Sequence, residues 1–369
     1  MLGEGILPGL QVGQTLWNPS FPRDVWVLGN FWEGEMRDRG MGVLLVVLVL
    51  SACTDSGVTT SPSPPEPTGP SPRQPAIGDL VDVRGEPIDV SSLQGRIVFS
   101  SGTNDIYTID ADGSGLKRLT TSEDLEFDPT WSPDGKAIAY RHQPGDDSTT
   151  DIFMMNADGS HRRNLTGSDG LGDWGPDWSP HGDWIAWNTA SAGFVFDLGL
   201  IHPDGTGRRV IKPGVYVEYP SWSPDGHRIA FMSPWKGSLY DIFVMNADGT
   251  HVRRLTESPA VDGWPAWSPD GRQIVFSSAR DDCAYSEAED CLTTGDIGPW
   301  HTLYVMNADG TDQHRLTRTF GQFAVWSPDG QYILFAPWLN VIRPDGTGLT
   351  RMPVEGTPAE PEMPDWIGA

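Results

Sequence analysis

The stretch WSPDGRQIVFSS, from Trp267 to Ser278, joins an aromatic residue, a tight-turn sequence and an alternating apolar run. Close copies begin elsewhere in the chain: WSPDGKAIAY at Trp131, WSPHGDWIAW at Trp178, WSPDGHRIAF at Trp222 and WSPDGQYILF at Trp326. A last partial copy, MPDWIGA, supplies a sixth tryptophan, Trp366. Long repeats of this kind are typical of solenoids and propellers, and strand-like patterns favour a propeller.

Each repeat contains four predicted β-strands. The first ends at the tryptophan, and SPDG then forms a type I turn that Ser opens, Pro preorganises and Gly closes. The second strand is the alternating run, the third reads DIYTID, DIFMMN, DIFVMN or TLYVMN, and the fourth ends in RLT or NLT. An Asp-Gly hairpin turn separates the third and fourth strands at 110–113, 156–159, 202–205, 246–249, 307–310 and 343–346.

The two ends of the repeat region complement each other. The first repeat, GRIVFSSGTNDIYTID, lacks its own tryptophan strand, whereas PEMPDWIGA at the C-terminus is a spare one. Pairing them would seal a ring and remove free sheet edges. We therefore predict an all-β fold, a six-bladed β-propeller over residues 95–369 with 3+1 closure by the C-terminal strand. One tryptophan per blade is expected to fill the wedge between sheets, with ligand stacking as the alternative.

The units WSPDG, DIFVMNADG and RRLT resemble the TolB-type, WD-repeat-like propeller repeats of bacteria. The resemblance covers residues 95–369 and implies the propeller fold. It also implies a role in protein contacts at the cell envelope, since TolB-type proteins act there through such contacts. Those proteins carry an extra α/β domain before the propeller, and residues 54–94 are too few and too Pro-rich to form one.

An export signal is predicted before the propeller. The segment MRDRGMGVLLVVLVLSAC contains two arginines and an apolar run, Val43–Leu50, that is too short to span a bilayer. Its end, LSAC, resembles the bacterial lipobox, which implies lipidation of Cys53 as the mature N-terminus. Residues 1–53 are thus interpreted as an extension plus a lipoprotein signal peptide, with translation expected to start at Met36 or Met41.

The segment 54–94 is expected to be a Pro- and Ser-rich disordered tether. The formal net charge of −25 disfavours nucleic acid and anionic lipid surfaces as partners. The expected protein is therefore a monomer that meets a membrane only through its lipid anchor, in the periplasm or at the cell surface.

Aromatic and acidic residues gather just before each repeated tryptophan, in LEFDPTW, GDWGPDW, VEYPSW, DGWPAW, GQFAVW and PEMPDW. In a propeller these links surround the mouth of the central channel, where such groups suit sugars, cationic peptides or a protein loop. Alternatively they only plug the channel and cap the blades. The candidate binding residues are Glu126, Phe127, Asp173, Trp174, Glu218, Tyr219, Asp262, Trp264, Phe323 and Glu362, and Met363 takes the aromatic position in the last link.

The longest variable loop, 278–301, holds Cys283 and Cys291, and an exported protein would join them in a disulfide. Its acidic residues could bind Ca²⁺ through carboxylate oxygens, although the loop lacks EF-hand spacing and a solvated acidic loop is the alternative. No other cofactor or metal site is expected.

No catalytic set stands out. A G-x-S-x-G motif is absent, the eight histidines are scattered, and the acidic residues Asp105, Asp151, Asp197 and Asp241 recur at the start of third strands like framework hydrogen-bond acceptors. We expect a noncatalytic propeller that binds an envelope protein, peptide or glycan on its variable-loop face. The alternatives are a channel-mouth lyase or glycosidase and a structural spacer.

Overall fold

The computed structural model describes part of one compact unit, Ser71–Ala369. The described residues are 85–145, 149–167, 172–191, 195–211, 213–234, 239–258, 260–280, 302–354, 356 and 360–368. The signal peptide, Cys53, most of the tether and the acidic loop with Cys283 and Cys291 lie outside these ranges, so those predictions stay predictions.

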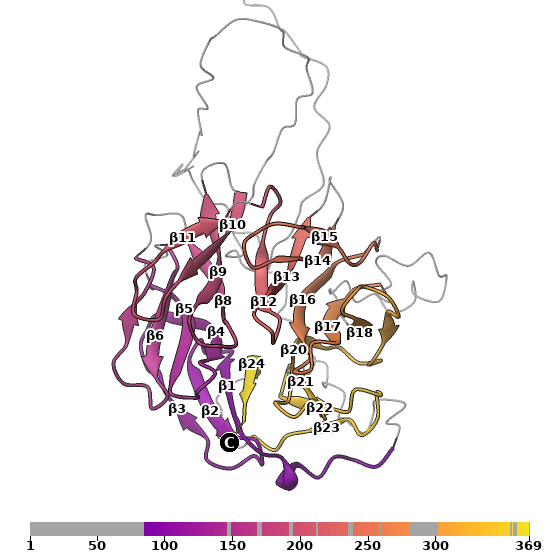
Figure 1. The fold of residues 1–369 in the computed structure, drawn as a ribbon. Coiled ribbons are helices and arrows are strands. Elements are labelled where there is room, and N and C mark those ends of the chain that lie inside the picture. Colours follow the sequence, from indigo (N-terminus) through magenta and orange to yellow (C-terminus); the bar gives the residue numbers. More distant parts are fainter. Residues whose placement is uncertain are drawn as a thin grey trace, which may run out of the picture. The chain divides into compact units, whose positions relative to one another are not determined.

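The described chain folds into six four-stranded antiparallel sheets, preceded by a short 3₁₀ helix, η2 (Val90–Ser92) (Figure 1). Blade 1 consists of β24 (Pro361–Ile367), β1 (Arg96–Ser101), β2 (Ile106–Asp110) and β3 (Lys117–Arg118). Blade 2 consists of β4 (Leu125–Trp131), β5 (Ala137–Gln143), β6 (Asp151–Asn156) and β7 (Arg163–Asn164). Blade 3 consists of β8 (Asp173–Trp178), β9 (Ile185–Ser191), β10 (Val195–Ile201) and β11 (Arg209–Ile211). Blade 4 consists of β12 (Glu218–Trp222), β13 (Arg228–Pro234), β14 (Tyr240–Asn246) and β15 (Arg253–Arg254). Blade 5 consists of β16 (Asp262–Trp267), β17 (Gln273–Ser278), β18 (Thr302–Asn307) and β19 (His314–Arg315). Blade 6 consists of β20 (Gln322–Trp326), β21 (Ile333–Ala336), β22 (Asn340–Ile342) and β23 (Thr350–Arg351).

The ring closes as the sequence predicts. The C-terminal strand β24 pairs antiparallel with β1, so that Trp366 lies opposite Ile97 and Ile367 opposite Arg96. The first strand of each blade contacts the first strand of the next, from β4 through β8, β12, β16 and β20 to β24 and back to β4. The predicted six-bladed propeller with 3+1 closure is therefore confirmed.

The repeated turns adopt the expected hydrogen bonds. In blade 5 the Gly271 amide donates to the Ser268 carbonyl at 2.9 Å, and the Ser268 hydroxyl donates to Asp270 at 2.7 Å. In blade 4 the Gly249 amide donates to the Asn246 carbonyl at 2.8 Å, with Gly249 at φ +84°, a conformation that glycine adopts without strain. Both turns follow strands of the same direction, so they lie on one face of the disc, called here the turn face.

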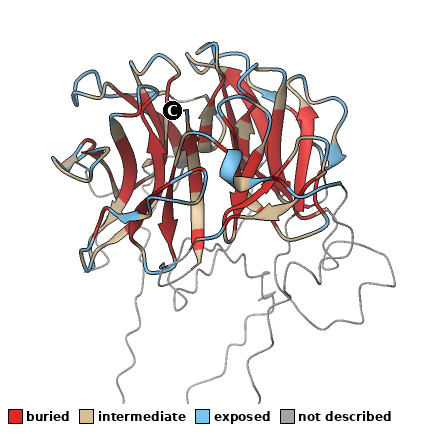
Figure 2. Cartoon of the chain, turned by 90° about the horizontal axis from the view of Figure 1, so that it is seen from below, coloured by how far each residue is buried: buried red, intermediate tan, exposed pale blue. Residues whose placement is uncertain are grey.

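The hydrophobic core is divided into six clusters, one at each junction between neighbouring blades. Each cluster contains one repeated tryptophan, and these side chains are only 3% to 9% exposed. The central strands of the sheets are largely buried, whereas short fourth strands such as β3 and β19 and the turns are exposed (Figure 2). The tryptophans therefore fill the junctions between blades, as predicted. Truncating one of them would remove packing contacts from both blades at its junction.

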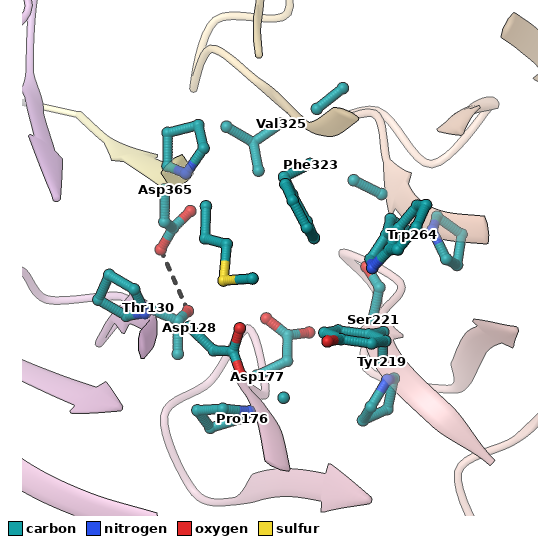
Figure 3. Close-up of a pocket in the computed structure, with 18 residues that line it drawn as sticks. Asp128, Thr130, Pro176, Asp177, Tyr219, Ser221, Trp264, Phe323, Val325 and Asp365 are labelled. Carbon is teal, nitrogen blue, oxygen red and sulfur yellow. Dashed lines mark hydrogen bonds between the residues drawn. The ribbon is translucent and has the colours of Figure 1, made fainter. Parts of the chain in front are cut away.

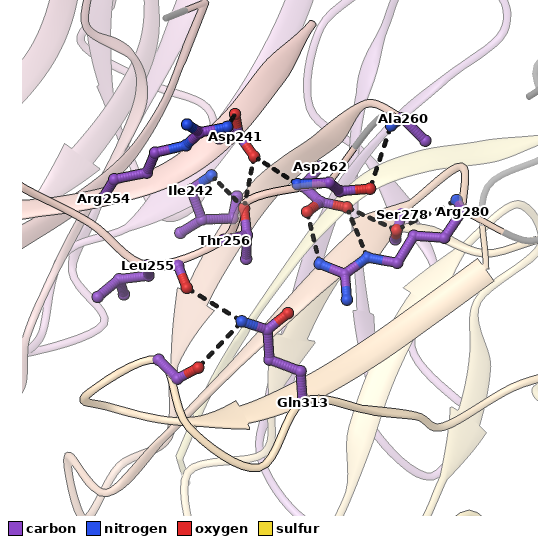
Figure 4. A network of polar contacts seen from close by, with 12 residues as sticks. Asp241, Ile242, Arg254, Leu255, Thr256, Ala260, Asp262, Ser278, Arg280 and Gln313 are labelled. Carbon is purple, nitrogen blue, oxygen red and sulfur yellow. Dashed lines mark hydrogen bonds and ion pairs between the residues drawn. The ribbon is translucent and has the colours of Figure 1, made fainter. Parts of the chain in front are cut away.

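Acidic residues at the start of third strands accept framework hydrogen bonds, as expected. In blade 4, Asp241 accepts from Arg254 at 2.5 Å, from the Thr256 hydroxyl at 3.2 Å and from the Ser258 amide at 3.2 Å (Figure 4). In blade 1, Asp105 accepts from Arg118 at 2.6 Å. These contacts join the third strand to the chain that leaves the fourth strand, which fixes the origin of each inter-blade link.

Candidate functional site

Each inner strand bulges at the same place, three residues before its tryptophan. The pairing register with the second strand shifts at this point in all six blades, for example between Gly263 and Ala266. The bulged residue has a positive φ of 47° to 56° in every blade. These residues are Asp128, Gly175, Tyr219, Trp264, Phe323 and Met363. Bulges re-aim side chains, and here they direct the residue into the central axis.

A cavity of about 140 Å³ lies on this axis. Three successive rings of residues line it, at three, two and one residues before the tryptophans. The third ring also lines a second cavity of about 410 Å³, which opens between the SPDG turns on the turn face. The third ring consists of Thr130, Asp177, Ser221, Ala266, Val325 and Asp365. The inner strands thus enclose one axial channel whose waist is this ring.

The channel is chemically asymmetric (Figure 3). Blades 1 to 3 contribute carboxyl groups, from Asp365, Asp128 and Asp177. Blades 4 to 6 contribute the aromatic rings of Tyr219, Trp264 and Phe323. Because the blades follow one another around the axis, an acidic half of the channel faces an aromatic half.

The acidic half contains a buried ion pair. Asp128 is 9% exposed, and its Oδ2 atom lies 3.4 Å from Nε of Arg141, whose side chain is equally buried. Neither Asp128 oxygen accepts a hydrogen bond from any described residue. The Arg141 guanidinium stacks over the Phe127 ring at 4.4 Å, on the side of the strand away from the cavity. Asp128 therefore has unused acceptor capacity beside the channel.

The two aspartates at the waist clamp neighbouring blades. Asp177 accepts the main-chain amide of Trp222 at 2.7 Å, and Asp365 accepts the amide of Trp131 at 2.7 Å and the Thr130 hydroxyl at 3.1 Å. Burial in the channel, with a smaller contribution from the nearby charge of Asp365, raises the pKa of Asp177 to about 8. Burial also raises the pKa of Asp365. The waist therefore holds carboxyl groups that are readily protonated.

Three of the predicted aromatic residues meet in the channel. The rings of Tyr219 and Trp264 lie 6.1 Å apart and those of Trp264 and Phe323 5.0 Å apart, both edge to face. Met363 joins them on the cavity wall. Phe127 and Trp174 do not line the cavity: Phe127 packs under Arg141, and Trp174 packs edge-on against Phe196 at 5.4 Å.

Three of the predicted carboxylates lie inside blades, so their expected place around the channel mouth is wrong. Glu126 is 1% exposed and accepts the Ser122 hydroxyl at 2.6 Å. Asp173 is 1% exposed, and burial raises its pKa. Asp262 is fully buried between Ser278 at 2.6 Å and Arg280 at 2.6 Å (Figure 4). All three stand five residues before their tryptophan, where the strand still faces its own sheet.

The remaining two carboxylates stand four residues before the tryptophan. Glu218 accepts the Tyr240 hydroxyl at 2.8 Å, and burial raises its pKa to about 7. Glu362 is partly buried, and burial together with the charges of Glu360 and Asp128 raises its pKa. Neither lines the axial cavity, although Glu362 stands beside its acidic half.

The sequence reasoning missed Asp128, Asp177 and Asp365, as well as Gly175. Counting a fixed distance back from each tryptophan would have found them, because positions three and one residues before it face the axis in every blade. Gly175 leaves space on the acidic half of the channel, because an added Cβ would lie 3.2 Å from the Tyr219 ring.

The fold and site define a six-bladed β-propeller with an amphipathic axial channel. The chain belongs to the family of the TolB beta propeller domain, whose model matches residues 95–238 and 212–284. It is similar to the Tol-Pal system protein TolB of Gluconobacter oxydans, with 46% identity over 52 residues, and to dipeptidyl-peptidase 5 of Porphyromonas gingivalis, with 39% identity over 46 residues. These matches cover 14% and 12% of this chain but only 11% and 7% of the relatives' own length.

The fold is also similar to the crystal structure of TolB from Acinetobacter baumannii. The TM-score is 0.58 at 21% identity, with 77% of this chain and 68% of that chain covered. Within the described ranges, no helix has the length and apolar character needed to cross a membrane. The same residues form no group of three or more His, Cys, Asp or Glu side chains arranged to hold a metal ion.

Proposed function

We propose that this protein is an exported, noncatalytic binding protein, anchored through lipid at Cys53, that holds an envelope protein or peptide at the loop-face mouth of its axial channel. The loop face is the side opposite the turns, where the links between blades vary in sequence. Variable loops on a rigid frame are where recognition usually occurs.

One observation carries the proposal. Tyr219, Trp264, Phe323 and Met363 are held at positive φ and line an axial cavity, although Tyr219 and Trp264 also pack against the core cluster that contains Trp267. A large side chain in the left-handed region costs of order 1 kcal/mol, and such residues concentrate at ligand sites. Apolar and aromatic surface in a concave site, flanked by a few polar groups, is the usual composition of a binding pocket.

Protein association is also the property suggested by the family. One relative is named as a component of a Tol-Pal system, and we carry over from that name only the tendency to associate with other envelope proteins. The predicted signal peptide and Pro-rich tether would place the propeller away from a membrane surface. A glycan is the competing ligand class.

The test is purification of a partner on the full-length protein from native envelopes, followed by reconstitution of the complex from the two pure components. The double variant Tyr219→Ala/Trp264→Ala is expected to lose the complex. Trp184→Ala is the matched control, because Trp184 stacks with His202 and Arg209 on blade 3 and lines neither cavity. A complex that survives the double variant would refute the proposed site.

The enzymatic alternative has its own outcome. Turnover of a glycan by the pure protein, abolished by Glu218→Gln, would replace the binding function with a catalytic one. The anchor is tested separately, since Cys53→Ser should leave the protein unprocessed or unanchored. Unchanged membrane retention of that variant would contradict lipidation.

A further inference from the structure

The two halves of the channel together specify a ligand group. The aromatic half presents Tyr219, Trp264 and Phe323 as an edge-to-face series on three consecutive blades. The waist below them continues as Ser221, Ala266 and Val325, of which only Ser221 has a side-chain donor or acceptor. A ligand on this side must therefore present apolar surface or a positive charge, since aromatic faces attract cations.

The acidic half presents mainly acceptors. Asp128 offers two buried carboxylate oxygens that accept no hydrogen bond from a described residue, and it lines the cavity (Figure 3). Asp177 accepts the Trp222 amide, and both oxygens of Asp365 accept main-chain amides, from Trp131 and Trp366. Arg141 offsets part of this charge, but its guanidinium stacks over Phe127, which does not line the cavity. Acceptors thus exceed donors on the cavity wall.

We propose that the channel takes up a cationic side chain, a lysine or arginine of the partner, with its alkyl stem against the aromatic half and its charge against Asp128. The inference rests on the proposed function and specifies the partner's anchoring group. An ammonium group has three donors and no acceptor, which complements this wall.

Other ligand classes fit less well. An anion would meet three carboxyl groups in a chain of net charge −25. A sugar ring carries hydroxyl groups around its whole edge, and those facing Ala266, Val325 and the rings would lose their hydrogen bonds to water without replacement. A cationic side chain avoids this cost because its stem is apolar and its polar atoms lie at one end.

The experiment compares short peptides on the full-length protein by isothermal titration calorimetry. The probes are Ac-Gly-Gly-Lys-Gly-Gly-NH₂, the same peptide with arginine, the same peptide with norleucine, and free cadaverine. Norleucine preserves most of the stem but lacks the ammonium group. We expect the lysine and arginine peptides to bind at least roughly tenfold more tightly than the norleucine peptide, since a paired charge contributes several-fold in affinity when partly desolvated.

Two variants locate the interaction. Trp264→Leu retains apolar bulk but removes the strongest cation-binding ring, and it should weaken the lysine peptide roughly 2- to 30-fold. Asp128→Asn removes the carboxylate charge beside the cavity and should also weaken it, without affecting the norleucine peptide. Trp184→Leu should leave all affinities unchanged. Circular dichroism melts identify any variant that fails to fold.

The outcomes are distinct. Equal affinity for lysine and norleucine peptides, or no binding of either, would overturn the inference of a cationic side chain. The proposed function is tested separately, by whether the partner complex forms and is lost in the Tyr219→Ala/Trp264→Ala variant. Cadaverine binding as tightly as the lysine peptide would assign the channel to a free diamine instead and overturn the partner side chain as its source. Loss of the partner complex only in Trp264→Leu and Asp128→Asn would support both proposals.

Discussion

Replacing Asp177 with asparagine should remove one source of the pH dependence of the propeller's stability. Asp177 sits at the channel waist, where it accepts the Trp222 amide at 2.7 Å. Burial raises the pKa of its carboxyl from 3.8 to about 8, and the neighbouring charge of Asp365 contributes in the same direction. Asparagine preserves the shape and an acceptor oxygen but never ionises, so the variant isolates the cost of ionising this buried group.

The sign follows from proton linkage. Because the pKa of Asp177 is higher in the folded state than in the unfolded chain, the folded protein holds the proton over the range between those values. The stability that this proton provides is fully present below the unfolded pKa and is lost as pH rises through about 8. Each pKa unit corresponds to about 1.4 kcal/mol, so the ceiling for the loss is on the order of 5 kcal/mol.

The other charged groups near the waist modify this figure. The charge of Asp365 acts on Asp177. Asp128 forms an ion pair with Arg141, and the charge of Asp128 acts on Glu362. A protein interior responds to a buried charge more than a dry medium would, so we expect about 2–3 kcal/mol of the ceiling to be observed between pH 5 and pH 8. Asp177→Asn should therefore become more stable than the wild type by this amount over that range.

The assay is urea unfolding followed by tryptophan fluorescence at pH 5 and pH 8. Asp134→Asn is the matched control, because hydrogen bonds from Lys136 and Ser132 lower the pKa of the exposed Asp134 to about 2, and its titration ends well below pH 5. The free-energy difference between this control and the wild type should be the same at both pH values. If the Asp177→Asn and wild-type curves stay parallel as well, the buried carboxyl does not hold a proton and the reasoning is refuted.

Three further predictions concern the framework. Trp366→Ala should lower the free energy of unfolding by about 3–5 kcal/mol in urea titrations, because its side chain fills the junction at which the ring closes, and a change under 1 kcal/mol would contradict closure by β24. Arg280→Met should cost about 3 kcal/mol, since it leaves the fully buried Asp262 without its ion pair, and Arg280→Met/Asp262→Asn should recover most of this loss. Tyr240→Phe removes a hydrogen bond that lowers the pKa of Glu218, so carboxyl ¹³C titration should show that pKa rising above about 7, and a fall would count against the contact.

The propeller could be predicted because every repeat contains the same turn and strand patterns. WSPDG fixes a turn through Ser268 and Gly271, the alternating run after it fixes a strand, and the unpaired ends near Arg96 and Trp366 fix the closure. Each of these depends on local backbone preferences or on period-2 burial, which a single sequence displays directly.

The channel lining was less accessible to sequence reasoning. The inner strands carry a bulge with positive φ at residues such as Tyr219 and Trp264, and no single residue type marks it, since aspartate, glycine, methionine and three aromatic residue types all occupy it. The bulge breaks the alternation of faces. Acidic residues were therefore assigned to the mouth at Glu126 and Asp262, which face their own sheets, while Asp128 and Asp177, which face the axis, were overlooked.

Site-specific photocrosslinking in the native cell tests most directly the claim that a partner segment enters the loop-face mouth of the channel. A benzophenone amino acid at Phe323, on the aromatic wall, should crosslink to a discrete partner at a peptide containing lysine or arginine. The same probe at the exposed Lys136, on the turn face, should give no such product. Crosslinks from Lys136 with none from Phe323 would place recognition on the wrong face for this account and contradict it.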